Sequence, residues 1–263
     1  MNASNTAVEL NARASKTFYA KLAETQTLLM QAATEYANPA NFAALGYSYI
    51  SQANSLGAED MVVSHLINSL QLDIGIFVLE TGMLHVETLK LLGEFKTASR
   101  APVEVFTPMR ESVVQFVKRE GKEPMYKSIE LRKACCGIRK MEPLERALAG
   151  KKAWITGLRR EQSGARADVP LRDESEAKRI KFNPLAEWTW GDVWHYISVN
   201  NVAYNPLHDQ FFPSIGCAPC TRAIALGEDF RAGRWWWEDE TAKECGLHAK
   251  DVSQSNRKVK AVA

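Results

Sequence analysis

Short apolar segments alternate with stretches of helical periodicity over most of this chain, and this alternation constrains the fold more than any other feature. Residues 47–50, 74–79 and 103–106 have the length and apolar character of buried strands, while residues 62–70 carry apolar side chains on one helical face. The same criteria predict helices at 84–95, 111–119, 142–148 and directly after Thr189, and strands at 153–158 and 179–182. The pattern favours an α/β fold, a mostly parallel sheet with helices on both faces.

The length of 263 residues suits one large domain or two small ones. Repeats, low-complexity tracts and a Pro/Gly-rich linker are missing, so we favour one domain with appendages. We expect one or two helices in an N-terminal appendage at residues 1–40, an α/β domain at 41–232 and a polar, mobile C-terminal tail at 233–263.

Charge and targeting signals exclude several classes of protein. Thirty-three Lys and Arg against 31 Asp and Glu leave a net charge of +2, which argues against a generic nucleic-acid or membrane-surface protein. The sequence near Met1 contains no apolar run typical of a signal peptide, and no stretch is long enough to span a membrane. We therefore expect a cytoplasmic protein that binds neither membrane nor nucleic acid.

The five cysteines indicate a metal or redox site in a reducing compartment. Cys135 and Cys136 are adjacent, and Cys217 and Cys220 form a C-x-x-C pair 80 residues later. Four thiolates from two such pairs could hold a [4Fe–4S] cluster or zinc. A cubane cluster offers four separate iron atoms and accepts adjacent cysteines more easily than one tetrahedral ion does. Buried apolar cysteines or a C-x-x-C redox pair remain alternatives.

Positive charge is concentrated around the first cysteine pair. Residues 127–166 contain eleven basic and four acidic side chains, a local excess of seven positive charges. This segment could face an anionic cluster or a phosphate-bearing substrate, or it could be a solvated helix face.

The loop after the first predicted strand reads SQANSLGAED (51–60). It matches neither a Walker A sequence nor a G-x-G-x-x-G fingerprint. Two interpretations stay open. The loop could bind phosphate at a helix N-terminus, or it could be an ordinary turn whose Glu59 and Asp60 complement the helix dipole.

The fifth cysteine, Cys245, stands apart in a polar segment with His248 three residues later. Basic neighbours lower the pKa of a thiol and make it reactive, so Cys245 is a candidate nucleophile. Arginine and tryptophan residues at 231–237 precede it, and they could equally belong to a core or an interface.

Six segments in this order resemble the assimilatory phosphoadenylyl- and adenylyl-sulfate reductase family. They are CCGIRKMEPL (135–144), WITGLRREQS (154–163), FNPL (182–185), GCAPCTR (216–222), RAGRWWW (231–237) and ECGLH (244–248). The resemblance covers most of the chain from about Tyr47 to His248. It implies an adenine-nucleotide alpha-hydrolase-like sheet related to the PP-loop pyrophosphatases, so residues 41–232 would be a nucleotide-binding reductase domain.

The resemblance also implies roles for individual residues. Cys245 would be the catalytic nucleophile. The four cysteines 135, 136, 217 and 220 would hold the [4Fe–4S] cluster of the adenylyl-sulfate branch, which reductases strict for the 3′-phosphorylated substrate lack. The residues expected to bind substrate are Ser55, Gly57, Lys140, Arg159, Arg166, Arg231, Arg234 and His248.

The reaction implied is thioredoxin-dependent reduction of adenylyl sulfate to sulfite and AMP through an S-sulfocysteine. The partners would be adenylyl sulfate and thioredoxin or a similar dithiol protein, with a homo-oligomer left open. Alternatives are the 3′-phosphorylated substrate, a cluster-bearing PP-loop tRNA thiolase and a zinc-stabilised module without enzymatic activity. Glu80 and Met83 depart from the Leu-Asp-Thr-Gly-Arg pattern frequent in the family, and Met83 lacks the cation found there.

Overall fold

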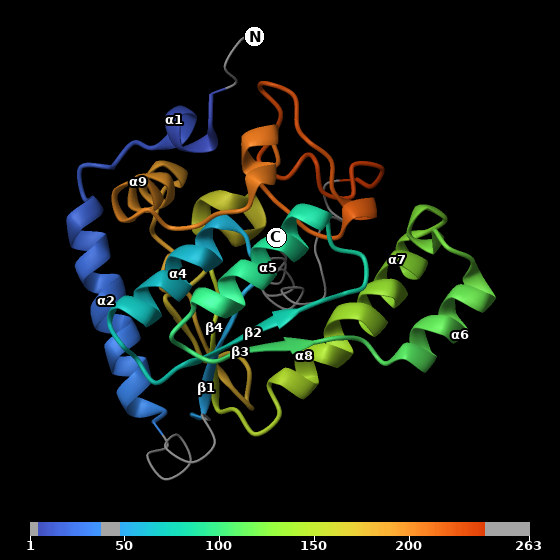
Figure 1. Cartoon of the computed structure of the whole chain (residues 1–263), viewed down its shortest axis with the longest axis horizontal. Helices are drawn as coiled ribbons and strands as arrows, with labels where there is room; N and C mark the ends of the chain where they lie inside the picture. The colour runs from blue at the N-terminus through green and yellow to red at the C-terminus, as the bar shows by residue number, and fades with distance from the viewer. Residues whose placement is uncertain (1–4, 38–47, 240–263) are drawn as a thin grey trace, which may run out of the picture.

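Six short strands form the sheet at the centre of the molecule (Figure 1), in the order β3-β2-β1-β4-β6-β5. The computed structural model describes residues 5–37 and 48–239. Neighbouring strands run parallel except β5, which pairs antiparallel with β6. The strands are β1 (Ile50–Ala53), β2 (Gly75–Leu79), β3 (Val103–Phe106), β4 (Ala153–Ile155), β5 (Arg172–Asp173) and β6 (Ile180–Phe182). The α-helices in the described ranges are α1 (Ala7–Asn11), α2 (Phe18–Glu35), α4 (Ala58–Ser69), α5 (Val86–Ala98), α6 (Arg110–Glu120), α7 (Ile129–Cys136), α8 (Glu142–Ala147) and α9 (Trp190–Asn200).

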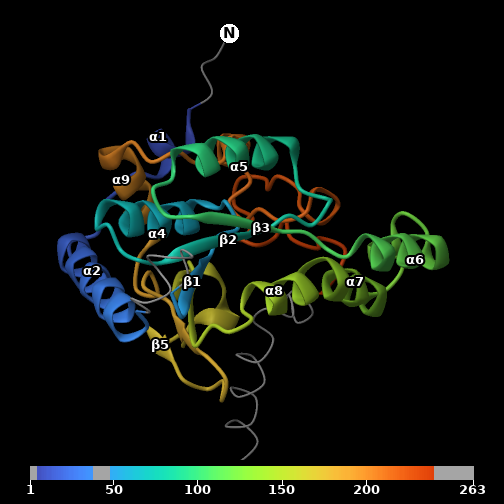
Figure 2. The ribbon, with the colours of Figure 1, turned by 60° about the horizontal axis from the view of Figure 1, so that its bottom comes forward.

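Each face of the sheet packs against its own helices, because side chains alternate between the two faces along a strand. Ile76 and Val78 of β2 join the larger hydrophobic core, to which α4 and α5 contribute. Phe77, between them, packs with Leu144 of α8 in a separate core. Figure 2 shows α4 and α5 on one side of the strands and α8 on the other. The predicted α/β fold, a mostly parallel sheet with helices on both faces, is confirmed.

The first strand lies further along the chain than predicted. We expected it at 47–50, but β1 begins at Ile50 and takes Ser51, Gln52 and Ala53 into the ladder between β2 and β4. These small and polar residues read as a loop in the sequence. Gln52 is nevertheless fully buried, because its amide accepts a hydrogen bond from Ser64 Oγ (2.7 Å) and donates one to the Asp60 carbonyl (2.8 Å). Tyr47 lies outside the described residues.

Helix α7, which carries the adjacent cysteines, was not predicted. Ser128 caps it by accepting a hydrogen bond from the Leu131 N–H at 3.2 Å. A π-helical turn, η2 (Gly137–Met141), joins α7 to α8. Arg132 is fully buried, so a charged residue occupies a core position of α7 and hides the apolar periodicity. π-Helical turns inside helices are frequent at functional sites.

The first residues of the predicted C-terminal tail, from Gly233 to Asp239, lie within the described structure. Residues 233–239 are part of the packed structure, with Trp235 only 1 % exposed. The backbone N–H of Trp235 donates a hydrogen bond to the Cys220 carbonyl at 3.2 Å. Thr221 and Arg234 form an isolated antiparallel bridge. The boundary predicted at 233 therefore falls inside packed structure.

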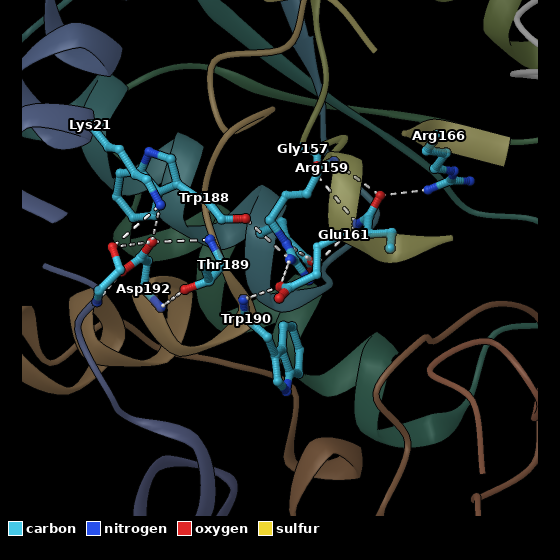
Figure 3. A network of polar contacts seen from close by, with 12 residues as sticks. Lys21, Gly157, Arg159, Glu161, Arg166, Trp188, Thr189, Trp190 and Asp192 are labelled. Atoms are coloured by element: carbon cyan, nitrogen blue, oxygen red, sulfur yellow. Dashed lines mark hydrogen bonds and ion pairs between the residues drawn. The ribbon is translucent and has the colours of Figure 1, made fainter. Parts of the chain in front are cut away.

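A buried carboxylate joins the N-terminal segment to α9, as Figure 3 shows on its left side. Asp192 accepts hydrogen bonds from the Ser15 N–H (2.7 Å), the Thr189 N–H (3.0 Å) and Lys21 Nζ (2.9 Å). Thr189 Oγ1 accepts in return from the Asp192 N–H at 3.0 Å, so the two residues form a capping box at the start of the helix predicted directly after Thr189. Burial alone would raise the pKa of Asp192, but these hydrogen bonds lower it to about 2.

We expect Asp192 to make folding stability depend on acid pH. A carboxylate with a pKa of about 2 in the folded state and about 3.9 when unfolded contributes roughly 2–3 kcal/mol above pH 5. That contribution is lost as the pH falls through 3.9 toward 2. Urea unfolding at pH 5 and pH 3 should show a smaller loss of stability for Asp192→Asn than for wild type. At pH 5 the variant should already be destabilised by about 3 kcal/mol, because Lys21 loses its buried partner.

The exposed carboxylate Asp73 provides the control for this measurement. Asp73→Asn should keep the wild-type stability at both pH values. An Asp192→Asn variant that loses as much stability as wild type between pH 5 and pH 3 would contradict the assignment.

Candidate functional site

The carboxyl ends of three parallel strands open into one cavity of about 220 Å³. The segments that follow β1, β2 and β4 contribute Ser55, Thr81 and Gly157 to its wall. Parts of residues 213–217 and 230–235 also line it. Open α/β sheets bind their ligands at this edge, so the cavity is the candidate active site.

The loop after β1 makes a sharp turn before α4. Leu56 has a left-handed backbone with φ of 63°, and the Asn54 carboxamide oxygen accepts from its N–H at 2.6 Å. The Asn54 amide also donates to Ser64 Oγ at 2.7 Å, which anchors the turn on α4. Ser55 and Gly57, both predicted to bind substrate, line the cavity. The N-terminus of α4 therefore lies at the cavity, where its dipole favours an anion.

Asp60 cross-links two walls of the cavity. Its carboxylate accepts hydrogen bonds from the Ser55 N–H (2.8 Å) and hydroxyl (2.5 Å), and from the Gly157 N–H (2.9 Å). Burial raises the pKa of Asp60 to about 6, against the lowering effect of these bonds. A Cβ on Gly157 would lie 2.5 Å from the Asp60 carboxylate, so only glycine allows this approach. The sequence left open a phosphate-binding loop or a turn in which Asp60 complements the helix dipole, and neither interpretation predicts the hydrogen bond from the Gly157 N–H.

Four of the five predicted substrate-binding cations line the cavity, namely Lys140, Arg166, Arg231 and Arg234. Arg166 is held by Gln162, whose side-chain oxygen accepts from it at 2.6 Å. Arg234 donates to the Ile215 carbonyl at 3.1 Å, while its buried Nε has no hydrogen-bond partner among the described residues. These cations converge on the same space as the α4 N-terminus, so the cavity suits an anionic ligand.

Arg159 does not line the cavity, contrary to the prediction. It is fully buried, and its guanidinium pairs with Glu59 (2.9 Å) and Glu161 (2.8 Å). Figure 3 shows the pair of Arg159 and Glu161 beside Trp190, whose ring lies 5.2 Å from the Arg159 guanidinium carbon. Because Glu59 and Glu161 balance its charge, Arg159 braces the cavity wall from behind. Arg159 belongs to the segment WITGLRREQS (154–163), but the sequence does not show which way its side chain turns.

His208 lines the cavity and was missed by the sequence analysis. Its Nε2 accepts a hydrogen bond from the Ala58 N–H at 3.2 Å, at the first residue of α4. Burial lowers the pKa of His208 to about 4, so the ring is neutral at neutral pH and can act as an acceptor. No spacing or motif in the sequence points to this histidine.

A second, smaller pocket lies beside the first and is lined by Cys135, Cys136, Cys217 and Cys220. The first pair ends α7, while Cys217 is the N-cap and Cys220 the last residue of the short helix η6 (Ala218–Cys220). The structure thus brings together two pairs that are 80 residues apart in the sequence. The two pockets share a wall made of Lys140, Cys217 and Trp235.

The donor set of this pocket fits an iron–sulfur cluster. Burial raises the pKa of the Cys135 thiol, and it raises the pKa of the Cys220 thiol to about 11, so without a metal these two thiols are poor nucleophiles. Thiolate ligands would gain stabilisation from Arg139 and Lys140, which also line the pocket. Among the described residues, no group of three or more His, Cys, Asp or Glu side chains is arranged to hold a single metal ion.

Met83 belongs to the cysteine pocket. It packs against the cluster of buried residues that includes Cys135 and Cys217, and its carbonyl accepts from the Ala218 N–H at 2.7 Å. Glu80 accepts from the Gly82 N–H at 2.6 Å and so closes the turn after β2. Glu80 and Met83, which depart from the family pattern, thus both have local structural roles. Cys245 and His248, predicted as nucleophile and substrate ligand, lie outside the described residues.

A family model described as the phosphoadenosine phosphosulfate reductase domain matches residues 49–223. The chain belongs to this family. A family member named adenosine 5′-phosphosulfate reductase from Neisseria meningitidis serogroup A is 52% identical over 198 residues, which cover 74% of this chain and 81% of the relative. The protein of the same name from Allochromatium vinosum is 51% identical over 202 residues, covering 76% and 79%.

Solved structures support the fold class. Phosphoadenylyl-sulfate reductase from Candida auris superposes with a TM-score of 0.61 at 24% identity, covering 79% of this chain and 98% of that one. FMN adenylyltransferase from Candida glabrata, solved with ATP, gives a TM-score of 0.53 at 13% identity, covering 93% and 84%. At these identities the likeness concerns the fold alone, and it confirms the α/β fold predicted for the family.

Because Gly157 lets Asp60 bridge two walls, we expect Gly157→Ala to disrupt the cavity. The added Cβ would force the Asp60 carboxylate away and cost about 1–3 kcal/mol of unfolding free energy. Denaturant unfolding should show this loss, and hydrogen exchange at the Ser55 amide should accelerate. Gly164→Ala is the matched control, since its Cβ would meet nothing within 4 Å. Equal stability and Ser55 protection in the two variants would contradict the bridging role of Asp60.

Proposed function

We propose that this protein reduces adenosine 5′-phosphosulfate to sulfite and AMP, a step of sulfate assimilation toward cysteine. The observation that carries the proposal is the 52% identity with relatives named for that activity, over about four fifths of their length. The cavity at the carboxyl ends of the strands supports it, because helix N-termini and arginines together bind phosphate-like groups.

The substrate would bind with its phosphosulfate in the cationic part of the cavity. Lys140, Arg231 and Arg234 line that space together with the loop at Ser55 and Gly57. Their charges would stabilise the negative charge that grows on AMP as it leaves. Arg166 would contribute a further contact, and His248 is proposed as a substrate ligand from the tail.

In the first step, the thiolate of Cys245 attacks the sulfur of the substrate. A bond forms between Cys245 Sγ and this sulfur, and the bond from sulfur to the bridging phosphate oxygen breaks. The electron pair of that bond leaves with AMP, which yields an S-sulfocysteine on the enzyme.

In the second step, a protein dithiol of the thioredoxin type supplies two electrons. One thiolate of the dithiol attacks Cys245 Sγ and releases sulfite, which leaves a mixed disulfide. The second thiol of the partner then displaces Cys245, so the partner becomes a disulfide and Cys245 returns to the thiolate. The nucleophile must therefore meet both the cavity and another protein, which favours its position in a C-terminal segment.

We assign Cys135, Cys136, Cys217 and Cys220 as ligands of a [4Fe–4S] cluster. The burial of three of these thiols and the cations beside them support this assignment. When bound, the cluster supplies charge that polarises the substrate cavity across the shared wall. The two electrons of the reaction come from the dithiol, so no electron from the cluster is required.

Free cysteines and a thiol reductant suit a reducing compartment, and we propose that the protein works in the cytoplasm. No helix in residues 5–37 or 48–239 combines the length and the apolar character needed to cross a bilayer.

Sulfite release by anaerobically purified protein with each nucleotide is the experiment that tests the function. With a thioredoxin system present, we expect turnover of adenylyl sulfate and at least tenfold lower kcat/KM with the 3′-phosphorylated form, whose extra charge needs additional cations. Cys245→Ser should bind AMP with wild-type affinity but release no sulfite. Preference for the 3′-phosphorylated nucleotide would reverse the substrate assignment. Normal turnover by Cys245→Ser would overturn the mechanism.

The cluster assignment predicts that Cys217→Ser loses iron and the brown colour, because a serine hydroxyl is a poor ligand for iron in this setting. Iron and acid-labile sulfide, measured per polypeptide, should fall well below four. Cys245→Ser provides the matched control and should keep wild-type iron. Full iron and sulfide in Cys217→Ser would rule out its role as a ligand, and zinc in place of iron in wild type would favour a zinc site.

A further inference from the structure

A buried ion pair joins the helix of the first cysteine pair to the chain that leads toward Cys245. Arg132 of α7 and Glu238 form a bidentate contact, with Nε–Oε1 at 2.9 Å and Nη2–Oε2 at 2.6 Å. The two side chains are only 1 % and 2 % exposed. In a buried bidentate pair, each charge is stabilised only while the other side chain keeps this geometry. Such a pair therefore fixes the relative position of the two chain segments that carry it.

Trp235 completes this contact. Its ring lies 4.6 Å from the Arg132 guanidinium carbon and 4.7 Å from that of Arg234, so two arginines flank one indole. Trp235 also belongs to the wall shared by the two pockets. Arg132, Trp235 and Glu238 thus connect α7 with the side of the substrate cavity on which Arg234 lies. We call these three residues the clamp.

The clamp lies at the base of the segment that carries the nucleophile. Glu238 precedes Cys245 by seven residues, and Arg132 precedes Cys135 by three. Seven residues reach at most about 25 Å, so the position of Glu238 limits how far from it Cys245 can lie. A confined thiol meets the substrate at a higher effective concentration than one on a loose chain.

We propose that the Arg132–Glu238 pair is a positioning device for sulfur transfer, which holds the chain leading to Cys245 against the helix that carries Cys135 and Cys136. The inference rests on the function proposed above. Arg132 lines the cysteine pocket, but neither Arg132 nor Glu238 lines the substrate cavity, so neither touches the substrate. They act indirectly, because they fix the chain at Glu238 and so influence the geometry in which Cys245 attacks the substrate.

Glu238→Gln tests the proposal, since it keeps the shape of the side chain and removes its charge. We expect wild-type iron content and AMP affinity within twofold of wild type, because the cavity and the four cysteines are unchanged. The rate of S-sulfocysteine formation at saturating adenylyl sulfate, followed by mass spectrometry in a single turnover without reductant, should fall about tenfold. Hydrogen exchange in residues 231–239 should accelerate.

Glu35→Gln is the matched control. Glu35 forms a similar bidentate pair with Arg172, at 2.7 and 2.9 Å, but on the surface and on α2. This variant should leave the single-turnover rate, the iron content and the exchange of residues 231–239 unchanged. Arg132→Lys, which keeps the charge and loses the bidentate geometry, should slow sulfur transfer in the same direction as Glu238→Gln.

An unchanged single-turnover rate in Glu238→Gln would overturn the proposal. So would a rate that falls only in proportion to lost iron or lost AMP affinity, because the pair would then serve folding alone. If neither variant retains iron and AMP binding, the positioning role is equally overturned. A wild-type protein that forms no S-sulfocysteine would overturn the proposed function instead, and the exchange of residues 231–239 would still test whether the pair fixes this chain.

Discussion

Parallel pairing of β2, β1 and β4 is the constraint on which the rest of the structure depends. Since parallel strands end at the same edge of a sheet, three separate stretches of chain leave the sheet side by side. Each stretch then contributes to one cavity, although their residues are about 20 to 100 positions apart. The cysteine pocket follows from the same geometry, because the turn after β2 brings Thr81 to 3.3 Å from Cys217.

The buried arginines differ in whether a carboxylate balances their charge. Arg159 and Arg132 are fully buried and meet carboxylates, so their charges are balanced inside the protein. Arg234 is almost as deeply buried, but its contacts are to neutral groups, Ile215 and Ser214. Its charge therefore acts on the cavity. The excess of seven positive charges in residues 127–166 overstates the charge that a ligand meets, because part of it serves the framework.

Periodicity in the sequence predicted most strands and helices, and the motifs predicted the cysteine pocket and four cavity cations. The residues whose positions the sequence did not predict were missed for physical reasons. Gln52 and Arg132 are polar residues buried through hydrogen bonds or ion pairs made by residues distant in sequence, and such partners leave no local pattern. Arg159 matched a motif, but the carboxylate of Glu59 turns it away from the cavity. His208 contacts the start of α4 from 150 positions away, which no spacing rule detects.

The shared wall of Lys140, Cys217 and Trp235 has an evolutionary consequence. A substitution at any of these positions changes the surroundings of both pockets at once. Neither pocket can therefore change at this shared wall without affecting the other. Tuning toward a new ligand is easier at positions such as Gln162 or Thr156, which line the larger pocket alone. Divergence within such a scaffold should thus accumulate on the side remote from the cysteines, leaving the boundary itself as the slowest part to change.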